Sequence, residues 1–312
     1  MANSLNSLTT TYAGEFAGKY ISAALLSANT IDKGGIEVKP NIKYKSVMKK
    51  VATGAVIADA SCDFTKTDDA VTITERILQP KEFQVNLEFC KKDFSEDFEA
   101  ISMGYSAFDN MPPLFTDYII GHVAGMVAEK TEQTIWEGVD GSGQFDGLAT
   151  LALADTDVLD VTGTTVDAAN VVAELGKIVD SIPASLYGKE DVHIYISQNI
   201  ARAYVRALGG FAATNSGVNA QSHMWYGDGA LSFDGVKLFV ANGLNDNTAM
   251  AAQKSNLFFG TGLLSDHNEV KVLDMADLDG SQNVRFVMRF TAGVQYGFAS
   301  DIVTYGIVNS AN

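Results

Sequence analysis

The sequence predicts an α+β fold, on three observations. One helical pattern runs without a break from Leu114 to about Gly138, which corresponds to about 37 Å at the standard helical rise. Strands that alternate between apolar and polar residues precede it, over 70–77 and, with strict alternation, over 83–89. A helix, a short strand and a second helix follow it, and the rest of the chain is mostly strands. Long runs of each type in separate parts of a chain are typical of this class.

Composition sets the outer limits on function. The chain has 312 residues, 46% of them hydrophobic and 19% charged, so it has enough apolar surface to bury a sizeable core. It carries 22 Lys and Arg against 38 Asp and Glu, a formal net charge of −16. Such an acidic chain cannot hold nucleic acid through a general basic face, because phosphate binding rests on Lys and Arg.

Cysteine usage and the N-terminus indicate where the chain is made. Cys62 and Cys90 are too few for a disulfide scaffold and are expected to be small buried hydrophobes. The N-terminus lacks the basic start and apolar stretch of a signal peptide, and the most apolar segment, 118–128, is too short to span a bilayer. We therefore expect synthesis in a reducing cytosol and no membrane contact.

The first eighty residues are predicted to be extended except for one short helix. Residues 1–12 are rich in Ser, Thr and Asn and predict an arm, and an amphipathic helix follows over 16–27. The segment 36–51 is polar and lysine-rich, without a helical period. The strands 70–77 and 83–89 surround a short break at 79–81, which predicts that they pair as a long two-stranded ribbon.

Two helices are predicted next. The first begins at Asp93, and its acidic start is explained by the helix dipole without any metal ion. Pro112 and Pro113 open the second, the 25-residue helix, because Pro is tolerated in a first turn. Its apolar stripe is formed by Phe115, Ile119, Val123 and Val127, with Trp136 near its end.

The second half predicts a helix–strand–helix layer followed by strands. Thr164 or Thr165 is expected to cap a helix that Pro183 ends, with one apolar face formed by Val172, Leu175, Val179 and Ile182. A strand over 192–196 leads to a helix capped by Ser197. Further strands are expected over 236–240, 257–259, 270–272, 284–290 and 302–303.

Motifs for catalysis or metal binding are not found. The four histidines lie far apart, with no partner at zinc spacing. No Gly-x-Ser-x-Gly elbow occurs, and the glycine-rich stretches miss the dinucleotide spacing. The aspartates after 155 and after 274 lack the glycine of a calcium loop. We therefore predict no enzyme, no cofactor, and no catalytic or metal-binding residues. The histidines are His122, His193, His223 and His267.

In this order, the elements resemble the tailed-phage major capsid (coat) protein family, whose shell fold is shared with encapsulins. The likeness spans nearly the whole chain and rests mainly on element order. Val71 to Cys90 looks like the family's extended loop running into its peripheral sheet, and Pro112 to Gly138 looks like its spine helix, ending in Ile-Trp-Glu-Gly. The axial-domain strand and the C-terminal strands are matched by 235–244, 256–261 and 294–305.

The resemblance implies a division of the chain. It gives an N-terminal arm over 1–40, an extended β-ribbon loop over 41–82, and a peripheral domain over 83–163 that contains the spine helix 112–138. An α/β axial domain over 164–263 and a β-rich return over 264–312 complete it.

The resemblance also implies a function. Copies would assemble as pentamers and hexamers into an icosahedral head that encloses double-stranded phage DNA, made in the bacterial cytoplasm and located in the virion. The expected partners are other copies, a portal and separate scaffolding or decoration proteins, with DNA contacted weakly and without sequence specificity. Alternatives are an encapsulin-like compartment that encloses a cargo enzyme, a tail-tube protein, and a hydrolase with dispersed carboxylates.

Charge is divided unevenly and suggests an interface between copies. Residues 1–92 hold 12 basic and 10 acidic side chains (+2), whereas residues 93–312 hold 10 and 28 (−18). One interpretation is a solvated lysine face. The other is that five lysines lie over acidic residues of a neighbouring copy and so fix register, while the alternating strand contacts that neighbour too. The interface residues so predicted are Lys39, Lys43, Lys45, Lys49 and Lys50, Phe83 and Val85, and Asp93, Glu96, Asp97 and Glu99.

Overall fold

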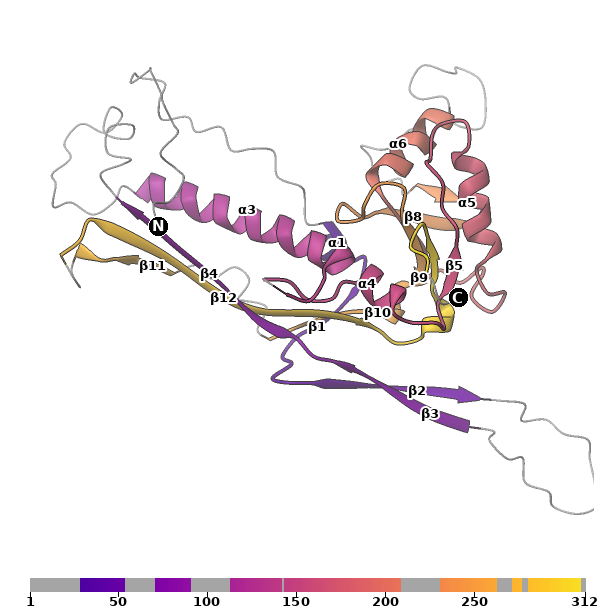
Figure 1. Ribbon diagram of the computed structural model, residues 1–312, viewed down its shortest axis with the longest axis horizontal. Helices are drawn as coiled ribbons and strands as arrows, with labels where there is room; N and C mark the ends of the chain where they lie inside the picture. Colours follow the sequence, from indigo (N-terminus) through magenta and orange to yellow (C-terminus); the bar gives the residue numbers. More distant parts are fainter. Residues whose placement is uncertain are drawn as a thin grey trace, which may run out of the picture. The chain divides into compact units, whose positions relative to one another are not determined.

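Figure 1 shows the computed structural model of the chain. It describes residues 29–53, 71–90, 113–141, 143–208, 231–262, 271–276 and 280–309. The predicted arm, the helix over 16–27 and the helix beginning at Asp93 lie outside these residues. Contacts divide the chain into a smaller unit (Met1–Leu25, Phe83–Val127, Ser265–Phe290) and a larger unit (Leu26–Glu82, Ala128–Leu264, Thr291–Asn312).

The smaller unit is built on the first part of a long strand, β12 (Asn283–Tyr296), whose residues from Thr291 on belong to the larger unit. β11 (Lys271–Asp274) pairs with it in antiparallel fashion, and β4 (Lys81–Cys90) also pairs with it. The core of this unit joins that sheet to the first half of α3 (Pro113–Glu137). It consists of Val123, Val284 and Phe286, with Val85, Leu87, Phe89, Val127 and Val272 packed against them.

The predicted pairing of 70–77 with 83–89 is wrong. β3 (Val71–Leu78) pairs with β2 (Ser46–Thr53), whereas β4 pairs with β12. Alternation shows that a strand has two different faces, but it does not identify the neighbouring strand. Here the side-chain contact from Glu88 of β4 reaches Asn283, which is 195 positions away. The break at 79–81 therefore separates two sheets instead of turning a hairpin.

The larger unit contains a mixed six-stranded sheet in the order β5-β13-β9-β6-β8-β7. β6 is parallel to β8 and antiparallel to β9, and β13 is parallel to β5. The helices α5 and α6 complete the predicted helix–strand–helix layer. The bounds are β5 (Leu159–Val161), α5 (Val171–Asp180), β6 (Val192–Ile196), α6 (Gln198–Ala207), β7 (Ser232–Phe233), β8 (Val236–Val240), β9 (Ala249–Gln253) and β13 (Val303–Tyr305).

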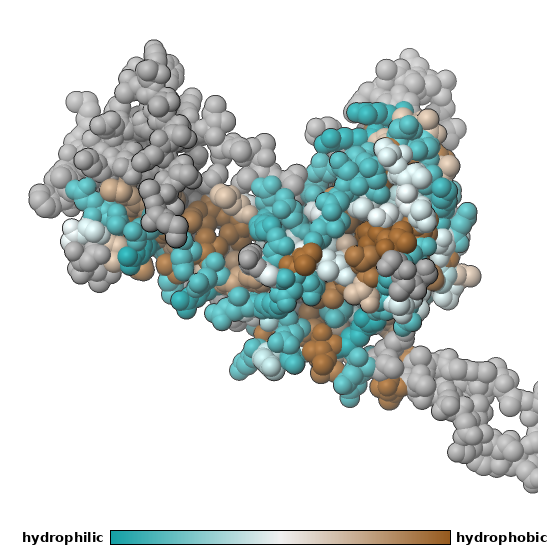
Figure 2. Space-filling view, viewed as in Figure 1, coloured by the Kyte–Doolittle hydropathy of each residue, from teal (hydrophilic) through white to brown (hydrophobic). Residues whose placement is uncertain are grey.

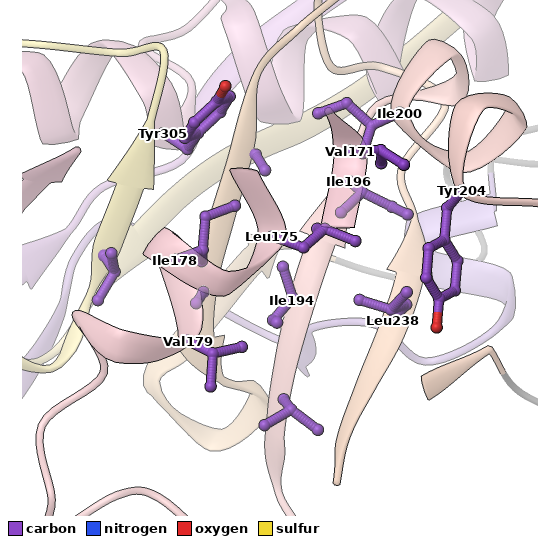
Figure 3. Close-up of a cluster of buried hydrophobic side chains, with 14 of the residues drawn as sticks. Val171, Leu175, Ile178, Val179, Ile194, Ile196, Ile200, Tyr204, Leu238 and Tyr305 are labelled. Carbon is purple, nitrogen blue, oxygen red and sulfur yellow. The ribbon is translucent and has the colours of Figure 1, made fainter. Parts of the chain in front are cut away.

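The core of that layer lies between α5, α6 and the sheet. Figure 3 shows Leu175 and Ile178 of α5 directed toward the strand that carries Ile194 and Ile196. All four side chains are essentially inaccessible to solvent. Tyr204 of α6 closes one side of this cluster, and its hydroxyl donates a hydrogen bond to the carbonyl of Ser232.

The helix α5 begins later than predicted. Instead of Thr164 or Thr165 capping it, the carboxylate of Asp167 accepts hydrogen bonds from the backbone of Ala169 and Asn170 and closes a turn before Val171. The predicted apolar face is corrected accordingly: Leu175, Val179 and Ile182 are buried, but Val172 is 50% exposed. Val171 takes its place, because residues at i, i+4 and i+7 share one face.

The remaining elements of the larger unit form a second sheet region and a two-stranded ribbon. β1 pairs in parallel with β10, which pairs in antiparallel fashion with the C-terminal part of β12. β2 and β3 form the ribbon, which extends from the rest of this unit in Figure 1. The bounds are α1 (Asn29–Asp32), β1 (Glu37–Lys39), α4 (Leu148–Leu153), η1 (Lys254–Asn256), β10 (Leu257–Thr261) and η3 (Ala299–Asp301).

A buried carboxylate joins α1 to α3 in the larger unit. Glu132 is 0% exposed, and its side chain accepts hydrogen bonds from the backbone N–H and the hydroxyl of Thr30. The indole N–H of Trp136, one helical turn later, donates to the same hydroxyl over 2.9 Å. The Trp136 ring packs against Tyr195 of β6 at 5.0 Å between centroids. α1, α3 and the six-stranded sheet therefore meet at one point.

The turn after β8 contacts α1 and α3 at the same place. The side-chain amide of Asn29 donates to the carbonyl of Val240, and the backbone N–H of Asn242 donates back to the Asn29 side chain. Gly243 lies so close to α3 that a Cβ at this position would stand 2.2 Å from the carbonyl oxygen of Glu132. Only glycine allows this approach without moving the helix.

Replacing Glu132 with Gln is expected to make stability less dependent on pH. Burial raises the pKa of Glu132, although hydrogen bonds from Thr30 oppose the shift. Because the folded-state pKa is raised, the contribution of this group is fully present below the unfolded value of about 4.3 and is lost as pH rises through the folded pKa. Glu132→Gln mimics the protonated form, so it should gain stability relative to the unmodified chain as pH rises.

The measurement is urea unfolding at a series of pH values, followed by tryptophan fluorescence. Glu129→Gln, on the same helix, controls for the loss of one negative charge. A difference between Glu132→Gln and the unmodified chain that stays constant from pH 4 to pH 8 would contradict the assignment.

Candidate assembly surface

The ribbon formed by β2 and β3 carries a row of exposed apolar side chains. Its antiparallel register places Val47 opposite Ile77 and Val51 opposite Ile73. Because successive side chains of a strand point to opposite faces, these two pairs share one face. The pair Lys49 and Glu75 lies between them. We call the face formed by these six residues the outer face of the ribbon.

The exposure of the outer face is high for β-branched residues. Val47 is 49% exposed, Val51 55%, Ile73 66% and Ile77 45%. In Figure 2, hydrophobic residues reach the surface of the stretch that Figure 1 draws as β2 and β3. Single exposed apolar residues are common on monomers, whereas larger exposed apolar patches rimmed by polar residues mark interaction sites.

The opposite face of the ribbon is held by the larger unit. Leu78 is 1% exposed and Met48 is 9% exposed. Leu78 packs so closely on β10 that a Cβ at Gly260 would meet its side chain at 2.9 Å. Arg76, directly across the strands from Met48, forms an ion pair with Asp155, just after α4. The ribbon is thus attached by one face at its base and bare on the other.

Arg76, Asp155 and Tyr296 form a contact that we call the ribbon anchor. The guanidinium of Arg76 lies over the ring of Tyr296, 4.7 Å from its centroid. The hydroxyl of Tyr296 lies 3.0 Å from the Asp155 carboxylate and 3.1 Å from the carbonyl of Leu151. Burial acts to raise the pKa of Asp155, but the hydrogen bond and charge of Arg76 hold that pKa below its ordinary value. The carboxylate is therefore kept charged against Arg76.

The chain is similar to known proteins in its structure and not in its sequence. No family model matches the chain, and no curated protein matches it. The capsid of a native GTA particle is 14% identical over 96% of this chain and 95% of its own, with a TM-score of 0.61. The capsid of cyanophage P-SCSP1u is 13% identical over 96% and 94%, with a TM-score of 0.59. The capsid of Myoviridae phage XM1 is 10% identical over 93% and 94%, with a TM-score of 0.61. The chain has the tailed-phage major capsid protein fold.

In this capsid fold, the predicted interface lysines lie along β1, β2 and the segment between them. Lys39 stands over the ring of Phe258 at 3.9 Å, and Lys45 stands over the ring of Tyr44 at 5.2 Å. Lys43 is exposed, and Lys49 lies on the outer face. The side chain of Lys50 and the whole of Asp93, Glu96, Asp97 and Glu99 lie outside the described residues. The charge pairing between copies therefore stays a prediction.

Phe83 and Val85 are half-buried and pack against residues of the smaller unit itself. The Phe83 ring packs at 5.7 Å from that of Phe290, and Val85 packs on the cluster around Phe286. Their alternation reflects burial against α3 and β12 partners in the same chain. Contact with a neighbouring copy stays a prediction.

The sequence did not predict that Val47, Val51, Ile73 and Ile77 share one exposed face. Their spacing is visible in the sequence, since Val47 and Val51 are four apart, as are Ile73 and Ile77. The lysines between Val47 and Val51 give this segment a polar composition, and the sequence does not show that it pairs with β3. Cross-strand register is what turns two scattered pairs into one face.

Chemistry elsewhere in the described part of the chain is limited. No group of three His, Cys, Asp or Glu side chains there is placed to hold a metal ion. His193 lies with its Nδ1 atom 3.0 Å from the carbonyl oxygen of Asp191, as a structural residue does. Among the same residues, no helix has the length and apolarity needed to cross a membrane.

Replacing Phe83 with Asp is expected to destabilise the smaller unit by about 2–4 kcal/mol, because it removes a packed ring and places a charge at its edge. Gln84→Asp adds the same charge on the exposed face of β4 and should change stability by less than about 0.5 kcal/mol. Hydrogen exchange of peptides from β4, β11 and β12 measures the difference. Equal protection in the two variants would show that Phe83 does not support this core.

Proposed function

We propose that the protein is the major capsid protein of a tailed bacteriophage. Many copies form pentamers and hexamers that close into an icosahedral head around double-stranded DNA, after synthesis in the bacterial cytoplasm. The observation that carries the proposal is the capsid fold, which covers at least 92% of the chain in each comparison. An encapsulin-like compartment is not favoured, because the particles named above are capsids of phages or of a GTA particle.

The outer face of the ribbon supports this function independently. A two-stranded ribbon is marginally stable alone and here leaves four large apolar side chains in water. A second copy that covered them would gain about 1 kcal/mol for each half-exposed side chain. Such a contact is weak singly, but every copy in a closed shell repeats it, so the total is large.

The proposal includes the division of the chain and its partners. The arm, extended loop, peripheral and axial domains take the bounds given above, with α3 as the spine helix. The five interface lysines would face Asp93, Glu96, Asp97 and Glu99 of a neighbouring copy. A portal and separate scaffolding or decoration proteins complete the head. The net charge of −16 disfavours tight DNA binding, which suits a container through which DNA passes.

Assembly of the full chain tests the function. Negative-stain electron microscopy should show rings or closed shells of uniform diameter. Only small discrete particles, at every protein concentration and salt concentration, would contradict it.

The double variant Val51→Asp/Ile73→Asp is expected to abolish shell formation while leaving the subunit folded. It places two carboxylates on the bare face and does not touch Met48, Leu78 or the anchor. Val51→Ile/Ile73→Val is the matched control, because it exchanges the two side chains of one cross-strand pair and preserves apolar area. Size-exclusion chromatography and microscopy separate the outcomes. Normal shells from the Asp variant would remove the outer face from the assembly contact.

A further inference from the structure

We propose that the ribbon anchor of Arg76, Asp155 and Tyr296 sets the direction of the ribbon and thereby the geometry of the assembled shell. The inference rests on the proposed function, since it assigns positioning residues to the same assembly contact. Of the three residues, Arg76 lies on the ribbon, on the face opposite the outer face.

The ribbon needs two fixed points to have a fixed direction. Leu78 supplies the first, because it is fully buried against Gly260 at the base of β3. A buried apolar side chain fixes position but exerts little directional preference. Arg76 is two residues farther along the same face, at about 7 Å by the rise of a strand. Holding Arg76 as well as Leu78 therefore fixes the angle at which β3 leaves the larger unit.

The anchor is suited to fixing an angle because each of its parts is itself held. Asp155 accepts the backbone N–H of Asp157 over 3.1 Å and lies 3.0 Å from the Tyr296 hydroxyl. Tyr296 is 0% exposed. The planar guanidinium contacts the ring and the carboxylate together, a geometry that an ammonium group does not reproduce. With side chains 31% and 17% exposed, the ion pair is also less screened than a pair at a free surface.

A small change in angle has a large effect at the far end of the ribbon. From Leu78 to Val71 is seven residues, about 23 Å along the strand. A rotation of about 10° about Leu78 would move that end by about 4 Å, more than the rise of one residue. The apolar pairs of the outer face would then miss their register on a neighbouring copy. Loss of the anchor should therefore disturb the curvature and uniformity of shells more than the folding of the subunit.

The first experiment measures ribbon direction in unassembled subunits. Spin labels at Lys49→Cys on the ribbon and Val172→Cys on α5, in a Cys62→Ala/Cys90→Ala background, report the distance between two parts of the larger unit. Removing a hydrogen bond to a charged group is expected to raise the population of displaced orientations about tenfold, so Arg76→Ala should widen the distance distribution. A distribution as narrow as that of the parent would overturn the proposal.

The second experiment measures shell diameters by electron microscopy. Arg76→Ala and Asp155→Ala should each yield fewer closed shells with mixed diameters, and the double variant should be no worse than either, because both remove one contact. Arg76→Lys should fall between them and the unmodified chain. Arg285→Ala is the control, since it removes an arginine from the exposed ion pair with Glu88.

The outcomes separate the two proposals. Uniform shells of unchanged diameter from Arg76→Ala would overturn the anchor and leave the proposed function standing. Failure of the unmodified chain to assemble would overturn the proposed function, and the spin-label distances would still decide the anchor.

Discussion

The buried carboxylate of Glu132 is the contact on which the larger unit depends. By binding Thr30 it fixes α1 against α3, and the chain that leaves α1 is then placed step by step. The carbonyl of Gly35 accepts a hydrogen bond from the hydroxyl of Tyr195. β1 comes next in the chain and pairs with β10. The ribbon begins at Ser46, seven residues after the end of β1.

The ribbon has two different faces. One face is attached through Leu78, Met48 and Arg76, and the other exposes four apolar side chains. A protein that worked as a monomer would lose little by replacing those side chains with polar ones, and it would avoid self-association. Their presence in register is therefore best explained by a surface that is covered in the working assembly. In the proposed assembly, one face of the ribbon would fix its position and the other would supply the cohesion between copies.

Local sequence patterns predicted those elements whose type does not depend on the strand or helix packed beside them. α3, β6 and β8 follow from helical periodicity or from short runs of β-branched and aromatic residues, and all three occur where expected. β9 was missed because Ala249 to Ala252 is buried on both faces and shows no alternation. The strand pairing could not be predicted for a different reason, because the partner of β4 is β12, which lies far along the chain. The same limit applies to the predicted interface. The cluster of lysines can be recognised from the sequence, whereas the outer face is formed only when β2 and β3 pair in register.

Electrostatics favours an apolar face as the cohesive surface of this particular chain. Copies that each carry −16 repel one another, so a contact that added buried negative charge would be costly. The outer face contains one lysine and one glutamate, opposite each other across the strands, and the rest is apolar. Covering it removes apolar area from water without burying net charge. Salt screens the remaining repulsion beyond about 8 Å at physiological ionic strength, a shorter range than the ribbon itself. A contact carried on the outer face of an extended ribbon, where Lys49 balances Glu75, can therefore join acidic bodies that would not associate directly.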